Sequence, residues 1–177
     1  MLLRNKRSSI NKQPPTINHI TMKFINKAIF LASLLFSVQF CSAQSAKELQ
    51  ETARSYMQQG DFTNAYLVLN KASVLEPKNI EITKDLALNY FFQRNYTGGL
   101  EEIKPVLDRE DADDQCYQLA GNLYRQLDET KECEKIYRKG IKRFPQSGAL
   151  YNDFGEMQWA QKNKEAIGLW EKGIEVE

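Results

Sequence analysis

The chain has 177 residues, of which 42% are hydrophobic and 27% are charged. This composition is typical of one soluble domain and excludes a collagen-like, disulfide-dense or strongly disordered chain. The net charge of +1 is unevenly distributed, because residues 1–43 contain six basic and no acidic side chains. Residues 44–177 contain 18 basic and 23 acidic side chains and no basic stripe, which disfavours nucleic acid as a partner.

The first 43 residues have the features of a secretory signal peptide. Residues 28–38 form an apolar run that is shorter than the ~20 residues a transmembrane helix needs. Lys23 and Lys27 precede this run and supply the positive charge typical of a signal peptide. We therefore expect export to the periplasm, the cell envelope or the medium, with no stable membrane span after cleavage.

Small residues at positions 41–43 favour a cleavage site between residues 43 and 44. Met22 opens a compact signal of the usual kind. Residues 1–21 are then interpreted as an extension that lies upstream of the natural start.

Three other interpretations of this segment remain. Cys41 is a candidate for lipidation, although the bulky Phe40 before it disfavours that modification. The apolar run could stay uncleaved as a signal anchor, which its short length disfavours. Residues 1–23 are basic and acid-free, as in a mitochondrial transit peptide, but Pro14-Pro15 interrupts the amphipathic helix that such a peptide needs.

A period of 34 residues runs through the rest of the chain, and such a period indicates a repeat architecture. Small and aromatic residues recur in phase at this interval: Tyr56, Tyr90 and Tyr124; Ala53, Ala87, Gly121 and Gly155; and Ala65, Gly99 and Cys133.

Each period predicts two antiparallel helices joined by a tight turn. Residues 49–56 carry apolar side chains at helical spacing, and Gly60 follows where a helix end favours a positive φ. A second helical stripe runs over 62–72 and is closed by Pro77. No strand-like alternation occurs in 44–177, so the expected fold class is all-α.

This pattern resembles the tetratricopeptide repeat family, in which small, aromatic and proline residues hold set positions of a 34-residue unit. The resemblance implies a right-handed α-solenoid of antiparallel helix pairs over 44–177. About four repeats are expected, over 46–79, 80–113, 114–147 and an incomplete 148–177.

Two places in the array depart from the regular pattern. Gly98, Gly99 and Pro105 weaken the second helix of the second repeat, expected over 97–108, which predicts either a shortened helix or a hinge. The last helix, Lys164–Val176, is expected to pack inward through one stripe: Ile167, Trp170 and Ile174.

The surface beyond that last helix, where a further helix would stack, is expected to be uncovered. Self-association through this end is one interpretation. The other is that the chain is a fragment of a longer repeat protein.

Enzymatic chemistry finds little support in residues 44–177. They contain no histidine, which excludes Ser-His-Asp and Cys-His catalysis and histidine-containing metal sites. Gly98-Gly99 lacks the Lys-Ser/Thr of a phosphate-binding loop. Cys116 and Cys133 are expected to be core residues without a disulfide, and Asp113 or Asp114 to cap a helix. We therefore expect no enzyme activity, cofactor or metal.

What remains is a binding surface, which the family resemblance places on a concave face lined by the first helix of each repeat. The expected groove residues are Arg54, Met57, Leu88, Phe91, Phe92, Asn122, Arg125 and Trp159. Phe91 and Phe92 form either an exposed apolar pocket or a pair in which Phe91 packs between helices and only Phe92 is partly exposed.

Some family members clamp a C-terminal carboxylate, an activity we do not transfer, because Arg54 is the only basic residue at the corresponding positions and Asp85 would repel the ligand. The expected function is a non-enzymatic scaffold that binds an unidentified protein or peptide. The alternative is the repeat arm of a larger envelope protein whose activity lies beyond residue 177.

Overall fold

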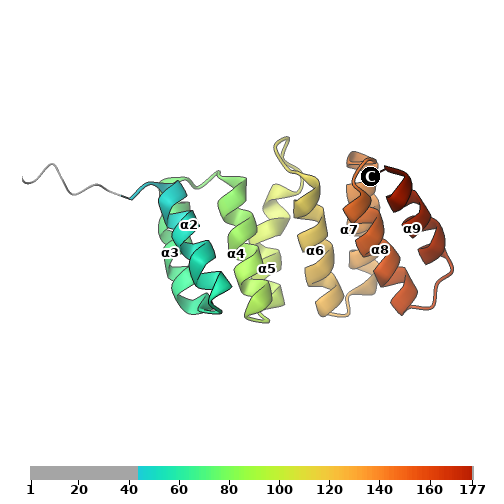
Figure 1. The fold of residues 1–177 in the computed structure, drawn as a ribbon, viewed down its shortest axis with the longest axis horizontal. Coiled ribbons are helices and arrows are strands. Elements are labelled where there is room, and N and C mark those ends of the chain that lie inside the picture. The colour runs from blue at the N-terminus through green and yellow to red at the C-terminus, as the bar shows by residue number, and fades with distance from the viewer. Residues whose placement is uncertain (1–43, 177) are drawn as a thin grey trace, which may run out of the picture. The chain divides into compact units, whose positions relative to one another are not determined.

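A computed structural model of the protein describes residues 44–176, so the expected signal peptide over 1–43 lies outside the described residues. The described part contains eight α-helices, one 3-10 helix and no strand. The helices form four pairs that follow one another along the array (Figure 1). The pairs are α2 (Ala46–Gln58) with α3 (Phe62–Leu75), α4 (Ile80–Phe92) with α5 (Tyr96–Ile103), α6 (Asp114–Gln126) with α7 (Thr130–Arg143), and α8 (Gly148–Ala160) with α9 (Glu165–Val176). The expected all-α repeat fold is confirmed.

A polar side chain caps the start of the first helix in every pair. Ser45 accepts a hydrogen bond from the backbone N–H of Glu48, and the Glu48 carboxylate accepts one in return from the Ser45 N–H. Asn79, Asp113 and Ser147 cap α4, α6 and α8 in a related way. The expected capping role of Asp113 is therefore confirmed.

The second repeat has a shortened second helix. The α-helix α5 ends at Ile103, and a 3-10 helix, η2 (Lys104–Val106), follows with Pro105 inside it. Proline lacks a backbone N–H and clashes with the carbonyl four residues earlier, so the α-helix ends before it. Of the two expected outcomes, the structure contains the shortened helix.

Small residues let the two helices of each pair approach closely. Ala53 of α2 and Ala65 of α3 are completely buried. An added Cβ at Gly121 would lie 2.5 Å from the Tyr137 ring, and one at Gly155 would lie 2.5 Å from the Trp170 indole nitrogen. The small residues of the 34-residue period therefore leave room for the aromatic rings of the second helices.

The last helix is oriented differently from the expectation. Ile167 and Ile174 are 53% and 75% exposed, whereas Ala166 and Gly173 are buried and Trp170 packs on α8. The expectation that both isoleucines pack inward is wrong. Successive residues of a helix point about 100° apart. Because Ala166 and Gly173 face α8, the residues that follow them, Ile167 and Ile174, face away from α8.

None of the helices within residues 44–176 combines the length and apolar character that crossing a membrane requires.

Candidate binding surface

The helices α2, α4 and α6 lie in one row along the array (Figure 1), and two adjacent cavities open along them. The first has a volume of about 320 Å³ and is lined by Arg54, Glu81, Lys84, Asp85, Leu88, Gln115, Gln118, Leu119 and Asn122. The second has a volume of about 300 Å³ and is lined by Arg54, Met57, Gln58, Asp85, Leu88 and Phe92. Because the two cavities share Arg54, Asp85 and Leu88, we treat them as one surface, called the groove.

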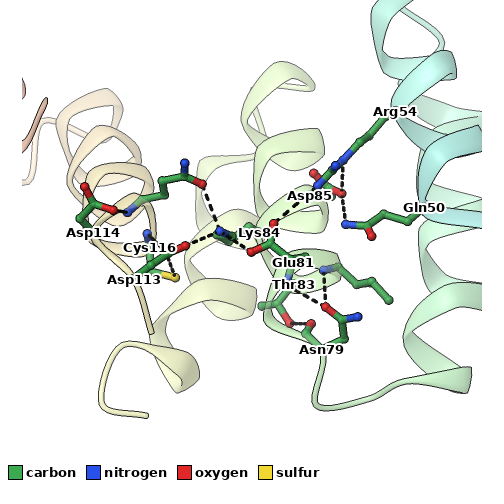
Figure 2. A network of polar contacts seen from close by, with 12 residues as sticks. Gln50, Arg54, Asn79, Glu81, Thr83, Lys84, Asp85, Asp113, Asp114 and Cys116 are labelled. Carbon is green, nitrogen blue, oxygen red and sulfur yellow. Dashed lines mark hydrogen bonds and ion pairs between the residues drawn. The ribbon is translucent and has the colours of Figure 1, made fainter. Parts of the chain in front are cut away.

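A buried carboxylate lies where the two cavities meet. Asp85 Oδ2 accepts hydrogen bonds from Arg54 Nε at 2.8 Å and from Gln50 Nε2 at 2.6 Å (Figure 2). Arg54 also lies 3.7 Å from the carboxylate of Glu81. The Arg54 guanidinium therefore has acidic neighbours on α4, and it ties α2 to α4 across the groove.

Lys84 is a buried residue in the lining of the first cavity. Its ammonium lies 2.5 Å from Asp113 Oδ2, 2.6 Å from Glu81 Oε1 and 3.0 Å from Gln115 Oε1 (Figure 2). Burial acts to lower the pKa of Lys84, but the hydrogen bonds and charges of Asp113 and Glu81 together raise it above its ordinary value. Lys84 therefore remains charged and is held by acidic neighbours.

The charges in the groove do not form a preformed site for an anion. Arg54 and Lys84 are each paired with carboxylates, and three acidic groups, Glu81, Asp85 and Asp113, surround the two cations. A ligand carboxylate would have to displace an existing ion pair, whereas a ligand amide, hydroxyl or ammonium group meets acceptors.

The apolar part of the second cavity consists of Met57, Leu88 and Phe92. Phe92 is 48% exposed, and its ring stacks on that of Phe62 with centroids 5.4 Å apart. Phe91 instead packs half-buried against the core, with its ring centroid 5.7 Å from that of Tyr96. Only Phe92 of the pair thus contributes to the groove.

Besides Phe91, the structure separates two more of the expected residues from the groove. Arg125 lies further along the array, where it pairs with Glu156 at 3.0 Å and donates to Asn122 Oδ1 at 2.7 Å. Trp159 is 61% exposed and lines a cavity at the α8–α9 end of the array, beside Ile167. The groove therefore unites five of the expected residues: Arg54, Met57, Leu88, Phe92 and Asn122.

Lys84 is one of seven groove residues outside the expected set; the others are Gln58, Glu81, Asp85, Gln115, Gln118 and Leu119. Lys84 occupies the fifth position of the second repeat, which the family pattern includes among the inner positions. In the sequence alone, Lys84 is not distinguishable from an ordinary solvent-exposed lysine, because it lies near the start of a helix that carries other charged residues. Its position in the repeat is the one signal that could have identified it.

Cys116 and Cys133, which lie within the described residues 44–176, are buried thiols that form no disulfide. Burial raises the pKa of Cys116 to about 12 and that of Cys133 to about 11. Cys133 Sγ donates to the carbonyl of Gly121 at 3.3 Å, a contact within the helix pair. In the part of the chain that the structure describes, no three His, Cys, Asp or Glu residues gather into a group suited to a metal ion.

Comparisons with known proteins identify the repeat. Residues 114–147, which include α6 and α7, match the family model for the tetratricopeptide repeat. The BBSome complex member BBS4 of Bos taurus is 23% identical over 162 residues, which cover 84% of this chain and 30% of that protein. The chain thus spans less than a third of the length of that curated relative.

Solved structures share the fold at low sequence identity. MamA 41-end from Desulfovibrio magneticus RS-1 has a TM-score of 0.64 at 19% identity and covers 75% of each chain. The first TPR of Spaghetti (RPAP3) bound to the HSP90 peptide SRMEEVD has a TM-score of 0.60 at 19% identity. That match covers 69% of this chain and 97% of the other.

Proposed function

We propose that this chain, whose residues 114–147 match the tetratricopeptide repeat and whose fold is that of repeat proteins, is a non-enzymatic scaffold whose groove binds a segment of another protein. The observation that carries the proposal is the cavity in which exposed Phe92 and half-buried Met57 and Leu88 lie directly beside the Arg54–Asp85 ion pair. A similar structure that carries a bound peptide supports a peptide as the ligand.

The groove chemistry indicates what this segment contains. An apolar side chain of the ligand would be desolvated against Phe92 and Leu88, and aromatic anchors commonly supply most of the binding energy at an interface. The acidic groups Glu81 and Asp85 favour ligand donors, such as backbone N–H groups, amides or a lysine, over a terminal carboxylate.

The test compares two single substitutions at side chains of similar exposure. Phe92 in the groove is 48% exposed, and Leu67 on α3, which lines neither groove cavity, is 54% exposed. Tagged wild type, Phe92→Ala and Leu67→Ala are used to capture partners from cells, and the recovery of each partner is quantified. We expect Phe92→Ala to lose ~1–2 kcal/mol of binding free energy and Leu67→Ala to retain wild-type recovery. Equal recovery by all three folded proteins would contradict the proposal.

We also propose that the scaffold works outside the cytoplasm, in the periplasm, at the cell envelope or in the medium. The support is the basic start, the short apolar run and the small residues at positions 41–43. Identification of Gln44 as the first residue of the mature protein would test this proposal.

A second candidate function is that of a repeat arm within a larger envelope protein. Exposed apolar side chains on α9, at positions that a following repeat would cover, favour this candidate. The reading frame downstream of residue 177 tests it. Further 34-residue periods or another domain would support the arm, and a stop codon directly after residue 177 would exclude it.

A further inference from the structure

The carboxylate of Asp85 keeps one oxygen unused where the two groove cavities meet. Asp85 is 7% exposed, and its hydrogen bonds from Arg54 Nε and Gln50 Nε2 both reach the same oxygen, Oδ2 (Figure 2). Within residues 44–176, no group donates a hydrogen bond to Oδ1. In that range, Asn89 Oδ1 is the only fully enclosed side-chain nitrogen or oxygen without a partner. Asp85 Oδ1 is therefore accessible from the cavities that Asp85 lines.

Unused donors lie next to this oxygen, at the end of the Arg54 side chain. Arg54 Nε binds Asp85, whereas the two terminal nitrogens donate no hydrogen bond to any residue between 44 and 176. One of them lies 3.7 Å from Glu81 Oε2, which is an ion pair but too long for a hydrogen bond. A guanidinium carries most of its N–H groups on these terminal nitrogens. Most donors of Arg54 therefore remain available on a side chain that is 48% exposed.

The other charges of the groove favour an uncharged ligand group at this place. The N–H groups of the Lys84 ammonium are already taken by three acceptors, which belong to Glu81, Asp113 and Gln115. Arg54 and Glu81 are the most exposed charges in the lining of the two cavities, at 48% and 50% of their side-chain surface, and they lie side by side. A charged ligand group of either sign therefore approaches a like charge, whereas an uncharged group with a donor and an acceptor does not.

The backbone of an extended peptide offers such a donor and acceptor together. In a pair of antiparallel strands, the N–H and the C=O of one residue point to the same side and bind the same neighbour. An α-helix cannot offer them, because its backbone groups bond to one another. The apolar side chains of Met57, Leu88 and Phe92 line the second cavity beside Arg54 and Asp85. An apolar side chain next to the bound backbone residue therefore has a place to enter.

On the basis of the function proposed above, we propose that the ligand of the groove is an internal, extended and locally uncharged segment of another protein. One residue of this segment donates its backbone N–H to Asp85 Oδ1 and accepts a hydrogen bond at its C=O from a terminal nitrogen of Arg54. The adjacent side chain is apolar and enters the second cavity. No terminal carboxylate takes part, so the segment can come from the middle of a chain.

Random peptides, displayed on phage between two Gly-Ser linkers, provide the ligands for a test. The purified chain selects peptides from this library, and counter-selection with Phe92→Ala removes those that bind outside the groove. We expect the recovered sequences to share an apolar residue flanked by uncharged residues. A selection that recovers no Phe92-dependent peptide would overturn the proposed function together with this inference. Recovered sequences that share an acidic or a basic residue would overturn this inference alone.

The backbone contact is measured on a selected peptide that is synthesised with both ends blocked. Amide-to-ester substitution replaces one backbone N–H at a time by oxygen and leaves every side chain in place. We expect the dissociation constant to rise at least ~10-fold at one position next to the apolar residue, because that N–H is the donor to a buried carboxylate. A peptide that tolerates the substitution at every position would bind through its side chains and overturn the proposal.

The donor role of Arg54 is tested by Arg54→Lys, which keeps a positive charge beside Asp85 and removes the terminal N–H groups of the guanidinium. The matched control is Arg138→Lys on α7, because Arg138 is 50% exposed, pairs with carboxylates and lines neither groove cavity. We expect Arg54→Lys to raise the dissociation constant of the blocked peptide at least ~5-fold and Arg138→Lys to leave it within ~2-fold of wild type. Circular dichroism confirms that both variants are folded. Wild-type affinity in folded Arg54→Lys would overturn the proposal.

The salt dependence of binding separates backbone contacts from ion pairs. Since the proposed contact forms no ion pair with the ligand, the dissociation constant of the wild-type chain should change less than ~3-fold between roughly 0.05 and 0.5 M NaCl. A larger rise would reveal an ionic contact with the ligand and overturn the proposal.

Discussion

Arg54 Nε and Asp85 Oδ2 lie 2.8 Å apart and join α2 to α4 across an interval of 31 residues (Figure 2). This interval is three residues shorter than the repeat. The side chain therefore contacts the first helix of the next repeat about one helical turn before the position equivalent to its own. The same interval recurs along the array, in Lys84–Gln115, Asn122–Asp153 and Arg125–Glu156. Polar residues on the inner side of the array therefore connect successive repeats, besides lining the groove.

Removal of the Asp85 carboxylate should destabilise the first two repeats. In Asp85→Ala the buried amide of Gln50 loses its acceptor, and an unsatisfied buried donor costs ~1–3 kcal/mol. Urea unfolding followed by circular dichroism measures this loss. Asp111→Ala is the control, because Asp111 pairs with Arg109 at the exposed surface, and we expect no measurable change there. An equal loss of stability in both variants would contradict the structural role of the Asp85 contacts.

The close contact at Gly121 predicts opposite effects of two glycine substitutions. A Cβ at Gly121 would clash with the Tyr137 ring, so Gly121→Ala should lower the free energy of unfolding by ~1–3 kcal/mol. Gly168 of α9 has open space around the same atom, and Gly168→Ala should stabilise the helix by up to ~1 kcal/mol. Thermal melts of both variants at low protein concentration provide the comparison. Melting curves that shift in the same direction would contradict the packing described for Gly121.

Much of this fold is predictable from the periodicity. The 34-residue phase of Ala65, Gly99 and Cys133 correctly marks buried positions where two helices cross, since such a crossing tolerates only small side chains. Pro105 correctly predicts a shortened helix in the second repeat. These features depend on local chemistry, which a single sequence contains.

Two kinds of feature are harder to predict: which of two adjacent faces of a helix is buried, and where a loop places its side chains. Ile167 and Ile174 lie next to the inward-facing stripe of α9, and an apolar pattern alone does not distinguish adjacent stripes. Phe91 and Phe92 are consecutive, yet the structure turns one toward the core and the other toward the groove. Asp113, which pairs with Lys84, lies in the loop just before α6. The helical periodicity does not extend into this loop, so it does not predict where the Asp113 carboxylate lies.

Cys116 and Cys133 should be inert while the protein is folded. Since burial raises the pKa of Cys116 to about 12 and that of Cys133 to about 11, the reactive thiolate is scarce at pH 8. Iodoacetamide at pH 8 should therefore leave both thiols unmodified in buffer and alkylate both in urea, as read by mass spectrometry of the intact chain. Rapid alkylation of either thiol in the folded protein would contradict the burial of that thiol.

The signal-peptide hypothesis predicts a defined mature N-terminus. Mass spectrometry of the protein from the exported fraction should identify Gln44 as its first residue. Expression of a variant with Ala43 replaced by a bulky residue, Ala43→Trp, should slow cleavage and leave precursor behind. A mature chain that retains residues 28–43, or that carries lipid on Cys41, would contradict the hypothesis.

The central claim, that the groove binds a partner segment, is tested most directly by site-specific photo-cross-linking. The photoreactive residue p-benzoylphenylalanine replaces Phe92 in one variant and Leu67 in another, because the two side chains are similarly exposed and only Phe92 lines the groove. Both variants are irradiated in cells, and cross-linked peptides are identified by mass spectrometry. We expect the Phe92 position to yield a recurrent cross-link to one segment of a partner protein and the Leu67 position to yield none. A recurrent cross-link from the Leu67 position, with none from the Phe92 position, would place the binding surface outside the groove and contradict this claim.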